Sequence, residues 1–128
     1  MLKEELVDLV RETQRLKAEQ QTVEVKAASK GCPKKLYDTL SSFSNQDEGG
    51  VILFCVDESK DFDVVGVYDA QDLQKHVSEQ CLQMKPKVQA LFTMADVDGC
   101  VVVSAEIPGM DVSERPCFYE GKGRLRGL

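Results

Sequence analysis

No hydrophobic run in the sequence approaches the roughly 18 consecutive apolar residues that a membrane-spanning helix needs. The first twenty residues are rich in charge and lack the apolar core of a signal peptide. The five cysteines are widely spaced and form no Cys-x-x-Cys pair, which argues against a zinc framework or a disulfide scaffold. Cys55 and Cys100 interrupt apolar runs, so we expect small core residues there. These absences predict a cytoplasmic protein that makes no membrane contact.

Signatures of common enzymes are also scarce. His76 is the only histidine, so most acid–base and nucleophile–base schemes have one possible centre, and its polar neighbours indicate an exposed helical residue. The sequence has no Gly-x-Ser-x-Gly elbow. The pair Gly49-Gly50 precedes a strand-like run and does not open a helix, as a P-loop or a dinucleotide-binding turn would. Nucleotide-binding enzymes of the usual kinds are therefore disfavoured.

Positive charge is in deficit, with 16 Lys and Arg against 22 Asp and Glu and a formal net charge of −6. Such a balance argues against an indiscriminate polyanion binder but leaves room for a local basic stripe. The 128 residues, 42% of them hydrophobic, suffice for one domain with one core and not for two. Because the chain stops on a glycine-rich basic stretch, 121–128, we expect a domain excised from a longer protein.

Hydrophobic periodicity predicts an alternation of helices and strands. Helices are expected over 2–17, 34–44 and 70–84, and strands over 22–26, 51–56, 64–67, 88–97, 100–107 and 117–119. Asp98-Gly99 predicts a tight hairpin between two of these strands. The order indicates an α+β (mixed α/β) fold, a single domain over residues 1–128 with a mostly antiparallel sheet flanked by about three helices.

Two roles are open for the first helix, over about residues 2–17. Its apolar face carries Leu2, Leu6, Leu9 and Leu16 at nearly heptad spacing. This stripe either packs on the domain's own core or pairs with the same helix of a second copy. In the second case the chain would be a non-catalytic dimerisation or interaction module.

Carboxylates gather around two predicted strands. Glu19 precedes the strand 22–26, Glu24 lies within it, and Asp57 follows the strand 51–56. If these strands are neighbours, the three side chains can meet at one end of the sheet. Clustered carboxylate oxygens suit Mg²⁺ or Mn²⁺, and such ions promote phosphodiester cleavage. The alternative is solvated charge, which is common in an acidic protein.

Basic residues form two groups along the chain. The first lies on and after the first strand, and the second lies near the end: Lys26, Lys30, Lys34 and Lys35, then Lys122, Arg124 and Arg126. Together they can track a phosphate backbone, with Lys34 and Lys35 expected in the first turn of a helix. The alternative is a pair of ordinary solvated surfaces.

Several short motifs follow one another along most of the chain. They are Glu19-x4-Glu24-Val25-Lys26, Leu40-Ser41-Ser42-Phe43-Ser44-Asn45, Gly49-Gly50-Val51-Ile52-Leu53-Phe54, Val56-Asp57, Val65-Gly66-Val67, Ile107-Pro108, Arg115-Pro116 and Tyr119-x-Gly121-Lys122-Gly123. This ordered set, over about residues 19–127, resembles the Schlafen-type AlbA-like domain. Three departures stand out. The family's glycine before Val-Asp is Cys55, its phenylalanine after the second glutamate is Val25, and the turn 45–50 is one residue longer.

The resemblance implies a relation to nucleic acids. Bacterial members are generally described as DNA-binding or transcription-regulator modules at the start of longer chains. Vertebrate Schlafen members bind structured RNA such as transfer RNA, and some cut it with acids that correspond here to Glu19, Glu24 and Asp57. The family thus points to the same three carboxylates as the strand pattern.

The leading hypothesis is a nucleic-acid-binding module of a cytoplasmic bacterial transcriptional regulator, whose basic residues contact the phosphates of DNA or structured RNA. The second is a metal-dependent ribonuclease in which Glu19, Glu24 and Asp57 bind Mg²⁺ or Mn²⁺ and position the attacking water. No other cofactor is expected. The third is the interaction module, a homodimer built on the first helix.

Overall fold

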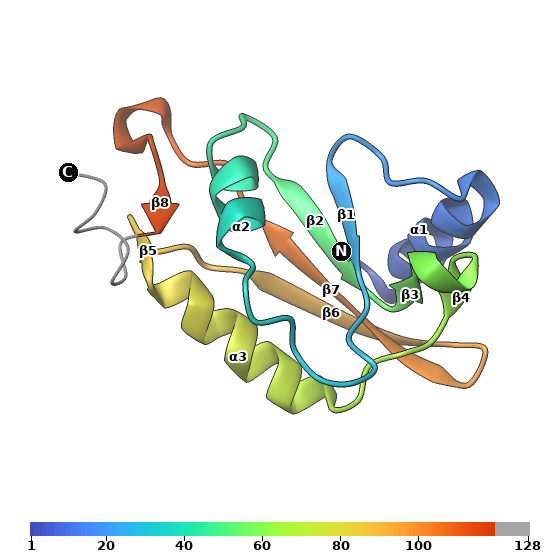
Figure 1. Ribbon diagram of the computed structural model, residues 1–128. Coiled ribbons are helices and arrows are strands. Elements are labelled where there is room, and N and C mark those ends of the chain that lie inside the picture. The colour runs from blue at the N-terminus through green and yellow to red at the C-terminus, as the bar shows by residue number, and fades with distance from the viewer. Residues whose placement is uncertain (120–128) are drawn as a thin grey trace.

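A four-stranded sheet runs through the middle of the chain in the computed structural model, which describes residues 1–119 (Figure 1). Its strand order is β1 (Val23–Lys26), β2 (Gly50–Phe54), β7 (Cys100–Ile107) and β6 (Leu91–Val97). β1 pairs with β2 in parallel, whereas β7 pairs with β2 and β6 in the antiparallel sense. The mostly antiparallel sheet with helices on it confirms the predicted α+β class.

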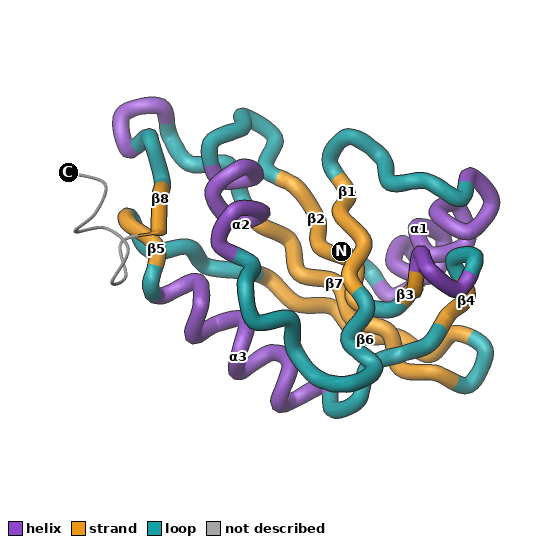
Figure 2. Tube along the Cα trace, in the orientation of Figure 1, coloured by secondary structure: helices purple, strands orange, loops and turns teal. Residues whose placement is uncertain are grey.

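Helices cover both faces of this sheet. The helix α1 (Lys3–Leu16) lies on one face, and α2 (Tyr37–Ser44) and α3 (Ala70–Leu82) lie on the other (Figure 2). Alternate side chains of β2 enter the two hydrophobic clusters: Ile52 packs under α2 and α3, and Leu53 packs under α1. The continuous apolar run of β2 follows from this burial on both faces. No helix within residues 1–119 is long and apolar enough to cross a membrane.

The position of α1 settles how its apolar face is used within the domain. Leu6 and Val10 are fully buried against the sheet. Leu2 and Leu16, at the two ends of the same stripe, are 66% and 44% exposed. The helix therefore packs on the domain's own core through its central turns. Pairing of two copies through this helix stays a prediction.

Two small antiparallel ribbons extend the sheet layer. In the first, β3 (Val56–Asp57) pairs with β4 (Asp63–Val64) across a short 3-10 helix, Glu58–Lys60. In the second, β5 (Met84–Lys85) pairs with β8 (Phe118–Tyr119), which follows another 3-10 helix, Val112–Glu114. The expectation that the third helix reaches residue 84 was wrong, because α3 ends at Leu82 and β5 follows it. The strand predicted over 64–67 is shorter in the structure: β4 begins one residue earlier, at Asp63, and ends at Val64.

The start of α2 also differs from the prediction. The helix begins at Tyr37, so Lys34 and Lys35 lie in the preceding loop and not in its first turn. The buried side chain of Gln80 in α3 explains this. Its Oε1 accepts a hydrogen bond from the Leu36 N–H at 2.8 Å, and its Nε2 donates to the Pro33 carbonyl at 2.9 Å. These bonds hold residues 33–36 against α3 and outside the helix.

Two turns behave as their residues predict. Asp98-Gly99 joins β6 to β7 with φ of 53° and 78°, the left-handed pair that a two-residue hairpin requires. Gly50, at the start of β2, packs against the ring of Phe43, and a Cβ at this position would overlap that ring.

The two cysteines expected in the core differ in burial. Cys55, directly after β2, is fully buried, and burial raises the pKa of its thiol to about 12. Cys100, also expected in the core, is only half-buried.

Candidate nucleic-acid interface

The parallel pairing of β1 with β2 brings two chain segments to one edge of the sheet. Lys26 lies opposite Phe54, so the loop after β1 and the β3–β4 ribbon leave from the same end. The loop after β1 is fixed there by a bridge between Ala28 and Val67. Lys30 in this loop is close enough to Asp57 to contribute to the lowered pKa of that carboxyl. The condition set by the sequence argument, that the two strands are neighbours, is therefore met.

Glu24 and Lys26 form an ion pair on β1. The Lys26 Nζ lies 3.2 Å from the Glu24 Oε2, and both side chains are about one third exposed. The hydroxyl of Thr39 in α2 donates a hydrogen bond to the same carboxylate oxygen. Glu24 thus links β1 to α2, and the ammonium of Lys26 is already partnered inside the domain.

Asp57 is engaged at the start of the 3-10 helix Glu58–Lys60. Its Oδ1 accepts hydrogen bonds from the Ser59 hydroxyl at 2.6 Å and from the Ser59 N–H at 2.9 Å. The hydroxyl contributes most to lowering the pKa of the Asp57 carboxyl, with smaller contributions from the charges of Lys60 and Lys30. The carboxylate is an N-cap of the kind that aspartate commonly provides.

Glu19 lies at the outer edge of β1, on the side away from β2. Its Oε2 accepts a hydrogen bond from the Val25 N–H at 2.7 Å. In a parallel pair, alternate amides of each strand bond to the partner and the others point outward. Glu19 therefore satisfies an outward-pointing amide of β1.

Each of the three predicted catalytic carboxylates consequently has its own polar partners. Within residues 1–119, no group of three or more His, Cys, Asp or Glu side chains lies close enough together to hold a metal ion. The strand pairing that would allow Glu19, Glu24 and Asp57 to meet is present, yet the structure does not make a three-ligand cluster of them. Their roles in catalysis and in binding Mg²⁺ or Mn²⁺ stay predictions.

Exposed lysines line the loop 27–36 between β1 and α2. Lys30, Lys34 and Lys35 are all exposed. No acidic side chain in the described part of the chain is within ion-pairing distance of Lys34 or Lys35. Of the four lysines predicted here to contact phosphates, only Lys26 is paired, so the loop presents the others outward. The second predicted basic group, Lys122, Arg124 and Arg126, lies outside the described residues.

A hollow of about 230 Å³ borders this loop. Its walls come from the loop and from α3, and they are Cys32, Pro33, Lys34, His76, Glu79, Gln80 and Gln83. His76 is exposed, as predicted, and its Nδ1 lies 3.2 Å from a carboxylate oxygen of Asp72. Burial, assisted by the charge of Asp72, raises the pKa of the Cys32 thiol to about 11, so this thiol is protonated at neutral pH.

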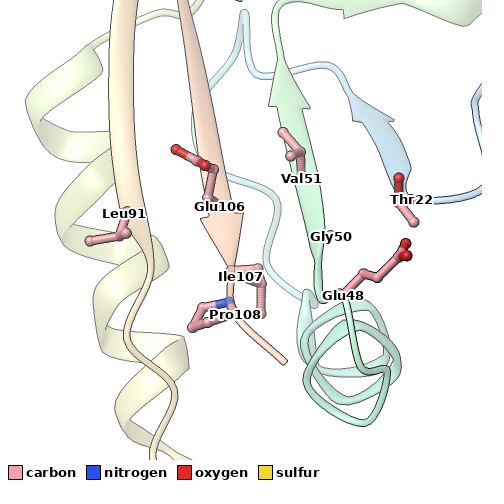
Figure 3. A pocket seen from close by; sticks show the side chains of 8 residues that line it. All are labelled: Thr22, Glu48, Gly50, Val51, Leu91, Glu106, Ile107 and Pro108. Atoms are coloured by element: carbon pink, nitrogen blue, oxygen red, sulfur yellow. The ribbon is translucent and has the colours of Figure 1, made fainter. Parts of the chain in front are cut away.

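A second hollow, of about 320 Å³, lies away from all these residues. Figure 3 shows it at the opposite end of β2, where Val51, Glu106 and Leu91 line it from three adjacent strands. The N-terminal ammonium of Met1 forms an ion pair with the Glu106 carboxylate. None of the predicted site residues reaches this hollow, so it is no part of the candidate interface.

Sequence reasoning missed what Ser41 and Asn45 do. The backbone N–H of Cys117 donates to the Asn45 Oδ1 at 2.7 Å, and its carbonyl accepts from the Asn45 Nδ2 at 3.0 Å. The Ser41 hydroxyl donates to the same carbonyl at 2.7 Å. These bonds fix the segment before β8 to α2. The signal was available, because both residues belong to the Leu40–Asn45 motif.

Comparison with solved structures places the fold among known ones. The chain is similar to the N-terminal domain of an ATP-dependent DNA helicase RecG-related protein from Nitrosomonas europaea, with a TM-score of 0.72 and 24% identity over 92% of this chain and 82% of that one. It is also similar to the DIP2311 protein from Corynebacterium diphtheriae, with a TM-score of 0.50 and 14% identity over 91% of this chain and 31% of that one. These two likenesses show a shared fold.

No curated protein matches the sequence. A family model, described as Schlafen, AlbA_2, matches residues 19–123, which is most of the chain. The matched range begins at Glu19 and includes the ordered motifs from β1 to the segment after β8. The chain therefore belongs to the Schlafen AlbA_2 family.

Proposed function

We propose that this domain binds nucleic acid through the phosphate backbone, as the binding module of a transcriptional regulator. The observation that carries the proposal is the loop 27–36, which presents Lys30, Lys34 and Lys35 to solvent. Membership of the Schlafen AlbA_2 family supports it, and so does the likeness to a domain of a protein described as DNA helicase RecG-related.

The state of each lysine decides how much it contributes. A phosphate displaces only counterions from Lys34 and Lys35, and the release of counterions around the nucleic acid favours binding. At Lys26 a phosphate has to compete with the Glu24 carboxylate, 3.2 Å away. Binding therefore depends mainly on the loop and less on the lysine of β1.

The proposed contacts orient the nucleic acid without selecting its sequence, because phosphates are the same at every position. Sequence selection in the regulator then comes from groups outside these contacts. Lys122, Arg124 and Arg126 stay predicted members of the same binding surface. The formal net charge of −6 keeps the rest of the surface from holding a polyanion, which confines binding to the basic residues.

A salt titration tests the proposal. Fluorescence anisotropy measures the dissociation constants of labelled duplex DNA and of a structured RNA hairpin between about 20 and about 200 mM salt, a range that separates electrostatic contacts. The double variant Lys34→Ala/Lys35→Ala lowers the slope of log K against log salt by about 2 on the duplex, because each lost phosphate contact removes about 0.9.

The control of equal charge is Lys3→Ala/Lys17→Ala, which removes two positive charges from α1 and its C-terminal end, across the sheet from the loop, and also removes the Lys17–Asp61 ion pair. It leaves the slope nearly unchanged. Absence of binding to both nucleic acids at the lowest salt contradicts the proposal. Equal losses in the two double variants contradict the assignment of the loop.

A further inference from the structure

We infer that the end of the molecule formed by α2, β5 and β8 is a stacking platform for unpaired bases, so that the domain prefers single-stranded nucleic acid. This inference rests on the proposed function and adds the class of substrate. Its centre is Phe118, and the stacked rings of Tyr37 and Tyr119 lie on the other side of β8. Figure 1 shows β8 and β5 next to α2, at the end of the molecule where α3 stops.

Phe118 is an aromatic side chain with no place in the core. It is 46% exposed and belongs to neither hydrophobic cluster of the described chain. In the β5–β8 ribbon it lies opposite Lys85, whereas Tyr119 lies opposite Met84. Met84 is fully buried, whereas Tyr119 is 36% exposed, so β8 presents an aromatic ring to solvent from each of its two sides.

The tyrosine pair makes the neighbouring surface rigid. The rings of Tyr37 and Tyr119 stack with centroids 3.7 Å apart and an angle of 17° between their planes. The Tyr37 hydroxyl donates a hydrogen bond to the Gln83 Oε1 at 2.9 Å. β8 itself is fastened to α2 by the bonds that Ser41 and Asn45 make to Cys117. Phe118 is thus an exposed ring on a fixed support, which is the arrangement that base stacking uses.

This platform continues directly into the basic loop. Lys34 and Gln83 line the same hollow, and Gln83 is the hydrogen-bond partner of Tyr37. Lys35 is two residues before Tyr37, and Lys87, two residues after β5, is also exposed. We therefore expect a strand whose phosphates lie on the loop to reach the aromatic end with its bases. Leu82, at the end of α3 and two residues before Met84, is also exposed, at 58%.

The chemistry favours unpaired bases over a duplex. In a duplex the base faces are stacked on one another, so an exposed ring gains contact only with bases that have left the stack. Single strands of DNA and RNA share both the phosphates and the free base faces. They form one class of ligand here. Single-stranded DNA and single-stranded RNA of the same length and sequence, tested side by side, show which of the two the domain prefers.

The chain contains no tryptophan, so Phe118→Trp introduces a single fluorescent reporter at the platform. We expect its emission to be quenched when a 12-nucleotide single strand binds to the full 128-residue chain, and to change little with the matched duplex. Leu2→Trp, at an exposed position of α1, is the control and shows no quenching.

Binding of the same oligonucleotides to Phe118→Ala is the second measurement. Its affinity for the single strand falls by at least about fivefold, the lower end for loss of one stacked base, and its affinity for the duplex stays within about twofold of the parent. An abasic strand of equal length binds both proteins equally weakly. The exposed position of Phe118 leaves the core intact in both variants.

Three results overturn the platform. The first is that the Phe118→Ala variant binds the single strand as tightly as the parent, while duplex binding still shows the salt dependence expected of the loop lysines. This result leaves the phosphate-binding proposal intact. The second is tryptophan emission from the Phe118→Trp variant that changes with protein concentration alone, which identifies an interface between two copies. The third is the absence of binding to every oligonucleotide at low salt, which removes the proposed function as well.

Discussion

Cations on the α1 face of the sheet and cations in the loop 27–36 differ in whether they have acidic partners. On the α1 face, cations are paired with acids from distant segments: Arg11 with Asp98, Lys17 with Asp61, and the Met1 ammonium with Glu106. On the opposite side, Lys34 and Lys35 have no acidic partner among residues 1–119. The paired cations join α1 to the hairpin and to the β3–β4 ribbon. The unpaired ones make no ion pair within residues 1–119, so their charge is available to a ligand.

This difference explains how an acidic protein can present a basic surface. The formal net charge of −6 is an average over the whole sequence. Acidic side chains near α1 already neutralise cations there, whereas the loop 27–36 keeps its positive charge locally. The proposed binding depends on the local arrangement of charges and not on their sum.

The largest effect that tests this comparison concerns how α1 is attached. Leu6→Ala empties a fully buried position and lowers the free energy of unfolding by about 2–5 kcal/mol, as such core truncations do. Leu2→Ala, on the same stripe but 66% exposed, changes it by less than about 0.5 kcal/mol. Urea denaturation measures both. Equal losses in the two variants would show that the helix is held in some other way.

A smaller effect is expected at the loop. Gln80→Ala removes the buried amide that bonds the Leu36 N–H and the Pro33 carbonyl, and leaving them unpaired costs about 1–3 kcal/mol of stability. The loop then loses its fixed path, so affinity for nucleic acid falls as well. Gln71→Ala, on the exposed side of α3, is the control for both readouts. Unchanged stability in Gln80→Ala would contradict the assigned hydrogen bonds.

The smallest effect comes from an ion pair of the α1 face. The Arg11 guanidinium donates two hydrogen bonds to the Asp98 carboxylate and lowers the pKa of that carboxyl below its ordinary value of 3.8. A lowered folded-state pKa means that the pair stabilises the protein above pH 3.8 and stops doing so as pH falls through the lowered value.

Urea midpoints between about pH 2 and pH 7 measure this contribution, because the linkage is read from how stability changes with pH. Asp98→Asn is less stable than the parent at neutral pH and declines less steeply with acid. Arg11→Gln gives the same loss, and the double variant gives no more than either single one, because both remove the same interaction. Additive losses would show that the two side chains act separately.

Much of the fold follows from local sequence. The hairpin at Asp98-Gly99 and the buried strand after Gly50 are each specified by a few adjacent residues. The third helix begins directly after Asp69, whose side chain accepts a hydrogen bond from the Asp72 N–H, as an N-cap aspartate does. Strands of two residues are too short to show the alternation of apolar and polar residues by which a strand is predicted. β5 forms only because β8, more than thirty residues later in the sequence, pairs with it.

The sequence identified which residues belong to the candidate site, but not which of them contact one another. The lysines of the loop and the three carboxylates were all identified from the sequence. That Lys26 is paired with Glu24 while Lys34 is unpaired depends on which face of β1 meets α2. The start of α2 depends on Gln80, which is 44 residues from Leu36 in the sequence. Such long-range contacts leave no local signal.

The hydrogen bond from Val25 to Glu19 has a consequence for assembly. β1 is a terminal strand of the sheet, and an unpaired edge amide is a template on which another chain can add a strand and begin to aggregate. The Glu19 carboxylate occupies that amide and places a negative charge at the edge. A substitution at Glu19 therefore frees this edge amide in addition to removing a candidate catalytic carboxylate, so aggregation has to be measured alongside any test for nuclease activity at this position.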